Sequence, residues 1–162
     1  MIDTPKLALM FVIVTSAVVS APASAGAQSG SSSAAVTPVP INSATFAKFM
    51  KASANFSSYM KAHPADADLG DASYDNEAEA AKAICDPRPG VKQAIAATGL
   101  TCSEWVTMTT ELEKAGSAAD MVKAGQKVPS EFGVSPADIA FYNAHTAEIK
   151  LALEEIGAAN AK

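Results

Sequence analysis

The sequence is poor in positive charge. Of its 162 residues only 12 are Lys or Arg, Arg88 is its one arginine, and the formal net charge is −5. Binding to nucleic acid or to an anionic membrane surface requires clustered Lys and Arg side chains. The charge balance therefore argues against both kinds of partner.

Strand-forming segments are scarce as well. After residue 27 the β-branched residues rarely form runs of strand length, aromatic residues are few, and alanine supplies much of the apolar content. Alanine has the highest helix propensity of all residues. The composition therefore predicts an all-α protein.

Several motifs that carry chemistry are missing. The sequence contains no C-x-x-C, no C-x-x-C-H, no G-x-S-x-G and no glycine-rich phosphate-binding motif. It thus gives no support to thiol–disulfide exchange, covalent haem attachment, a serine nucleophile or nucleotide binding. We expect a non-enzymatic protein with no catalytic residues and no resident cofactor or metal.

The N-terminal residues have the order of a secretory signal peptide. Lys6 precedes the uncharged segment 7–19, which is too short to span a bilayer and is followed by small residues at 23–27. We expect residues 1–27 to be removed by cleavage after Ala25 or Ala27, which leaves about 135 residues, enough for one domain. This predicts a bacterial protein that is periplasmic or secreted, with no stable membrane insertion after cleavage.

Residues 28–41 are uncharged and rich in Ser, Ala and Pro. Such segments lack the periodicity of a helix or strand and act as tethers. We predict a flexible spacer over 28–41 and a single helical domain over 42–158.

The two cysteines, Cys85 and Cys102, both lie in the mature part. An even number of cysteines in an oxidising compartment predicts one disulfide bond between them. A bond that closes such a loop removes on the order of 3 kcal/mol of chain entropy from the unfolded state. The alternative is two free thiols, of which Cys102, near a helix N-terminus, would be the more reactive.

Three segments begin with residues that cap helices. Each capping residue has an acidic or apolar partner inside the first turns, and apolar residues flank the start. The three sets are Asn42 with Ile41 and Phe46, Thr101 with Glu104, Leu100 and Trp105, and Ser135 with Val134, Pro136, Asp138 and Ile139.

Apolar periodicity predicts helices over about 43–62, 75–85, 91–98, 102–124 and 136–157. The residues expected to point inward are Phe46, Phe49, Met50, Phe56 and Met60; Ala78, Ala81 and Ile84; Trp105, Met108, Leu112, Ala115, Ala119 and Val122; and Ile139, Tyr142, Ile149, Leu153 and Ile156. We predict a compact antiparallel bundle of three long and two short helices, joined by the disulfide.

Two stretches carry a resemblance. GLTxxEW at 99–105 and VSPADIAF at 134–141 resemble small exported all-helical bacterial proteins of unknown function. The resemblance covers about residues 43–156 and consists mostly of helix-start signals. It implies the fold class and the exported location, but no activity and no site residues.

The acidic segment 66–77 has part of the pattern of a calcium-binding loop. Asp66, Asp68 and Glu77 occupy its first, third and twelfth positions, but Gly70 and Asp71 are transposed relative to it. The transposed glycine would put the sharp bend in the wrong place. A solvated acidic loop is the favoured interpretation.

His145 and Glu148 are three residues apart and share a helix face. A metal site would need further ligands, and His63 is the only other histidine. We therefore expect a surface or partly buried hydrogen bond between His145 and Glu148.

Haem could be held without covalent attachment by Met50 or Met60 together with His145. Methionine among phenylalanines at helical spacing is also ordinary core filling, which we favour.

Together these features favour a non-enzymatic binding or interaction module of the cell envelope, whose partner is an envelope protein or a small ligand. Phe132 and Phe141 would form an apolar contact surface if they lie outside the core. Tyr142 and Asn143, beside His145, form a polar band that could line a small cleft, and a bundle edge that faces solvent explains the band equally well. The alternative is a metal- or haem-binding bundle or small enzyme that uses His145, Glu148 or the loop 66–77.

Overall fold

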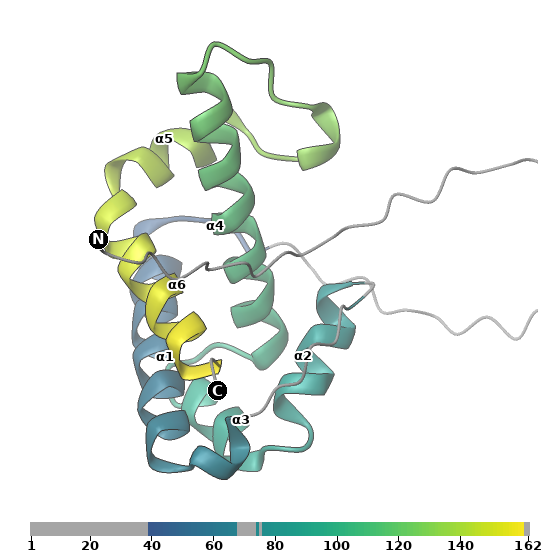
Figure 1. Ribbon diagram of the computed structural model, residues 1–162, viewed down its shortest axis with the longest axis vertical. Helices are drawn as coiled ribbons and strands as arrows, with labels where there is room; N and C mark the ends of the chain where they lie inside the picture. Colours follow the sequence, from purple (N-terminus) through teal and green to yellow (C-terminus); the bar gives the residue numbers. More distant parts are fainter. Residues whose placement is uncertain (1–38, 68–73, 75, 161–162) are drawn as a thin grey trace, which may run out of the picture.

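The structure is a computed structural model, and it describes residues 39–67, 74 and 76–160 (Figure 1). This part contains six α-helices, two 3₁₀-helices and no strand, so the predicted all-α class is confirmed. The elements are α1 (Ser43–Ala62), η1 (Pro64–Asp66), α2 (Glu77–Cys85), α3 (Pro89–Ala96), α4 (Cys102–Lys123), η2 (Ser130–Phe132), α5 (Pro136–Ala144) and α6 (Thr146–Asn160). The predicted signal peptide and most of the predicted spacer lie outside the described residues.

The helices are arranged around the two longest ones, α1 and α4 (Figure 1). α6 and α3 pack against α1, whereas α2 and α5 pack against α4. α6 also contacts α4, so the two halves share one core. No helix in the described part combines the length and apolarity needed to cross a membrane.

The core centres on Trp105, which is 2% exposed. Its indole ring lies 4.8 Å from the ring of Phe56, and its Nε1 donates a hydrogen bond of 3.1 Å to Ser53 Oγ. Most residues predicted to point inward are buried or packed against the core. The prediction that Val122 points inward is wrong, because this residue is 52% exposed near the end of α4.

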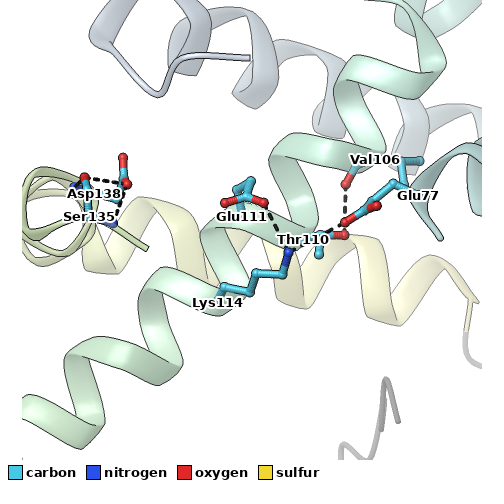
Figure 2. A network of polar contacts seen from close by, with 7 residues as sticks. All are labelled: Glu77, Val106, Thr110, Glu111, Lys114, Ser135 and Asp138. Carbon is cyan, nitrogen blue, oxygen red and sulfur yellow. Dashed lines mark hydrogen bonds and ion pairs between the residues drawn. The ribbon is translucent and has the colours of Figure 1, made fainter. Parts of the chain in front are cut away.

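The capping residues of the three predicted helix starts are confirmed, although the Thr45 partner of Asn42 was not predicted. In each, a side-chain oxygen of the capping residue accepts a hydrogen bond from a backbone N–H in the first turn, and the partner side chain accepts one in return. The pairs are Asn42 with Thr45, Thr101 with Glu104, and Ser135 with Asp138, the last of which Figure 2 shows.

The predicted disulfide bond is also present. Cys85, the last residue of α2, is bonded to Cys102, the first residue of α4, and their Cα atoms are 6.5 Å apart. The bond therefore ties α2 to the N-terminal end of the central helix.

The helix predicted over 136–157 is instead two helices, α5 and α6, which meet at His145. Thr146 Oγ1 donates to the Tyr142 carbonyl oxygen at 2.8 Å, and the His145 backbone N–H lies 3.1 Å from the carbonyl oxygens of both Phe141 and Tyr142. Such a bond bends a helix without ending it, because Thr109 and Thr110 form the same bond within the continuous α4. The break at His145 coincides with the packing of its ring against Phe46 of α1. The described part of the domain accordingly has six α-helices in place of the five expected.

Candidate functional site

A hollow of about 340 Å³ lies where the C-terminal end of α4 meets the junction of α5 and α6. The sequence predicted a polar band at Tyr142 and Asn143, and both residues line this hollow. The complete lining is Ala119, Asp120, Val122, Lys123, Tyr142, Asn143, Thr146 and Lys150.

Tyr142 is held in place by the backbone of α4. Its ring lies over Gly116, where a Cβ atom would come within 2.8 Å of Tyr142 Cζ. The group that occupies the space beside Gly116 is therefore this phenol ring. The residue is only 8% exposed, yet its hydroxyl forms no hydrogen bond with any described residue.

The electrostatics of the hollow favour a protonated phenol beside free cations. Burial, together with the nearby Asp120 carboxylate, raises the pKa of Tyr142 above its ordinary value. The hydroxyl therefore stays a hydrogen-bond donor across the physiological range. The ammonium groups of Lys123 and Lys150 form no ion pair within 4.0 Å with any described residue. The hollow thus presents several donors and one acidic group.

His145 lies at the same junction but packs against α1. Its ring centroid is 5.0 Å from that of Phe46 and 4.5 Å from that of Phe141. Its Nδ1 is 2.7 Å from Glu148 Oε2, which confirms the predicted hydrogen bond. Because Phe141 is partly buried against the core, it does not stand free as an apolar contact surface.

The other predicted ligand residues are dispersed. His63 stacks on Tyr59 at 4.1 Å between ring centroids, and Met60 is buried in the core. Within the described ranges, no group of three or more His, Cys, Asp or Glu side chains is placed to hold a metal ion.

Both ends of the acidic segment 66–77 have structural partners. Asp66 Oδ2 accepts a hydrogen bond of 2.8 Å from the Tyr59 hydroxyl. Lys114 Nζ lies 3.6 Å from Glu77 Oε1 and 3.2 Å from Glu111 Oε1, so it bridges α2 and α4 (Figure 2). Asp68, Gly70 and Asp71 of the predicted loop lie outside the described residues.

Sequence reasoning missed half of the hollow. Asp120, Lys123 and Lys150 look like ordinary solvated charges on two helices that are separated in the chain. The sequence indicates close packing only at Gly116, because a glycine lets a neighbouring group approach the helix. It does not identify that group. Comparison with known proteins adds no assignment, because no family model, no curated protein and no solved structure matches this chain.

Proposed function

We propose that the chain is exported through its N-terminal segment and acts as a non-enzymatic binding domain of the bacterial cell envelope. The observation that carries this proposal is the Cys85–Cys102 disulfide bond. Structural disulfides persist in oxidising compartments and are rare where thiols are kept reduced. The signal-like order of residues 1–27 supports the same location.

The arrangement of polar groups supports binding rather than catalysis. The hollow offers hydrogen-bond donors and ammonium groups on a rigid helical frame, which is what recognition of a polar ligand requires. The imidazole of His145 is held by Glu148 and by two aromatic rings. These contacts give it a role in packing at the α5–α6 junction.

Export is tested by expressing the full chain in a bacterium and measuring the intact mass of the protein in each cell fraction. We expect periplasmic or secreted protein that has lost residues 1–25 or 1–27 and carries an oxidised cysteine pair. Cytosolic protein that keeps Met1 and two reduced thiols would contradict the proposal. The Cys85→Ala/Cys102→Ala variant is the mass control for the disulfide.

Binding is tested on the same exported protein by crosslinking in the native envelope and by thermal-shift screening of small metabolites. A reproducible partner or ligand supports a binding domain. Metal analysis and an absorption spectrum address the alternative that His145, Glu148 or the loop 66–77 holds a metal or haem. A stoichiometric metal or a haem spectrum would replace the proposed function with that alternative.

A further inference from the structure

We propose that the hollow between α4, α5 and α6 binds a small organic carboxylate with an apolar body. The Tyr142 hydroxyl and the ammonium groups of Lys123 and Lys150 would bind its anionic oxygens. This inference rests on the proposed binding function and names the site and the ligand class for it.

The first argument is the hydroxyl of Tyr142. A side-chain hydroxyl that is not bonded within the fold is available to bind a ligand. Tyr142 is 8% exposed and lines the hollow, and its hydroxyl, which is open to the hollow, has no partner among the described residues. The phenol is protonated at neutral pH, and it can donate to an acceptor on a ligand, as the Lys and Asn side chains of the lining can. An anionic oxygen is the acceptor that gives the stronger bond.

The second argument is charge. The lining carries two ammonium groups, from Lys123 and Lys150, against the single carboxylate of Asp120. The chain as a whole has a net charge of −5, so this lining is positive where the molecule is negative. A small anion is therefore attracted to the hollow, and a cation of the same shape is not. The side-chain amide of Asn143 adds a further donor.

The third argument is the apolar part of the lining. Val122 is one of two large hydrophobic residues in the described part that are strongly exposed, and it lies at the hollow beside Ala119. The apolar body of a ligand would cover Val122, Ala119 and the edge of the Tyr142 ring, which removes apolar surface from water. A bare inorganic anion would leave these side chains exposed.

The fourth argument is size. At about 340 Å³ the hollow is near the lower end of the range for small-molecule sites. It is large enough for an aromatic or branched aliphatic acid. A folded partner chain would require a much larger contact area.

The test uses phenylacetate as the probe, with phenylacetamide as an uncharged molecule of the same shape and 2-phenylethylamine as a cation. Mature, oxidised full-length protein is titrated with each, and backbone amide chemical shifts are followed by NMR. We expect saturable shifts at Val122, Asn143 and Lys150 with phenylacetate. We expect phenylacetamide to bind about tenfold more weakly or worse, because it lacks the charge that strengthens the hydrogen bonds.

Variants locate the binding groups. Tyr142→Phe keeps the ring over Gly116 but removes the donor, and we expect it to weaken phenylacetate binding about tenfold. Lys123→Gln and Lys150→Gln should each weaken it severalfold. The matched control is Lys127→Gln, which removes the same charge from the exposed loop between α4 and η2, outside the hollow. This control should bind phenylacetate with unchanged affinity.

The outcomes separate this inference from the proposed function. Equal binding of phenylacetate and phenylacetamide, or equal losses in Lys150→Gln and Lys127→Gln, would overturn the carboxylate site. If phenylacetate causes no shifts while the exported protein still captures another ligand or partner, the inference fails and the binding function stands. Protein that stays reduced in the cytosol contradicts the proposed function whatever the titration shows.

Discussion

Two tyrosines in this molecule lie over glycines on neighbouring helices, and they differ in what their hydroxyls do. Tyr59 of α1 lies over Gly90 at the start of α3, and Tyr142 of α5 lies over Gly116 within α4. A Cβ atom on either glycine would overlap the phenol ring. The same close approach is therefore used at both places.

The Tyr59 hydroxyl donates to Asp66, and its ring stacks on His63, so all of its groups have partners within the fold. The Tyr142 hydroxyl has no such partner and lines the hollow. The Tyr59 hydroxyl is thus bonded within the fold, whereas the Tyr142 hydroxyl remains available as a hydrogen-bond donor. The two ends of α4 differ in the same way. We call the N-terminal end, where Trp105 is buried and the disulfide bond lies, the closed end, and the C-terminal end, which borders the hollow, the open end.

The largest expected loss of stability comes from truncating the Trp105 side chain at the closed end of α4. Trp105→Ala removes a buried ring and its hydrogen bond to Ser53, and we expect a loss of about 3–5 kcal/mol in the free energy of unfolding. Urea denaturation followed by circular dichroism measures it. Val122→Ala, at the open end of the same helix, is the control and should cost far less. Similar losses for the two variants would remove the distinction between the ends.

Removing the disulfide bond should cause the second-largest loss of stability. Cys85→Ala/Cys102→Ala releases a loop whose ends are 17 residues apart, and we expect a loss of about 3 kcal/mol. The midpoint of urea unfolding, with and without reductant, gives the value. Reductant should lower the stability of the natural sequence but leave the double variant unchanged. Unchanged stability of the natural sequence after full reduction would mean that the disulfide bond does not stabilise the closed end of α4.

The contacts between glycine and tyrosine should have a smaller effect. Gly116→Ala puts a methyl group against the Tyr142 ring, and overpacking of this kind costs about 1–3 kcal/mol, partly offset by the better helix propensity of alanine. In a Tyr142→Ala background the clash is absent, so the same change should stabilise the protein by up to about 1 kcal/mol. Thermal unfolding of the four proteins of this cycle measures the sign. Destabilisation in both backgrounds would show that the ring is not what Gly116 accommodates.

The smallest expected change in stability comes from replacing Glu113 on α4. Burial raises the pKa of its carboxyl above the ordinary value, and it forms no hydrogen bond or ion pair with the described residues. The folded state therefore holds the proton more tightly than the unfolded state, so stability falls as the pH rises through the pKa of the folded state. Glu113→Gln should raise the melting temperature at pH 7 but not in acid below the ordinary carboxyl pKa. An equal gain at both pH values would contradict this.

Local chemistry made much of the fold predictable. Asn42, Thr101 and Ser135 cap helices through partners within three residues, so the helix starts could be identified without knowing the rest of the structure. With only two cysteines in the chain, an oxidised pair has one arrangement. The predicted hydrogen bond from His145 to Glu148 also depends only on spacing along the chain.

Features that depend on neighbours from elsewhere in the chain escaped prediction. Val122 follows the apolar period of α4, but it lines the hollow between α4, α5 and α6 and stays 52% exposed. Asp120, Lys123 and Lys150 carry no signal until α4 and α6 meet beside Tyr142.

The amino-acid order alone therefore settles the helical class, three helix starts and the cysteine pairing, because each depends on residues close in sequence or on the lack of any alternative. Folding in three dimensions decides that the last helix breaks at His145 and that a hollow opens at Tyr142. Both outcomes depend on contacts between the α5–α6 junction and other helices, namely His145 with Phe46 of α1 and Tyr142 with Gly116 of α4. Contacts of this kind have no periodicity along the chain from which they could be predicted.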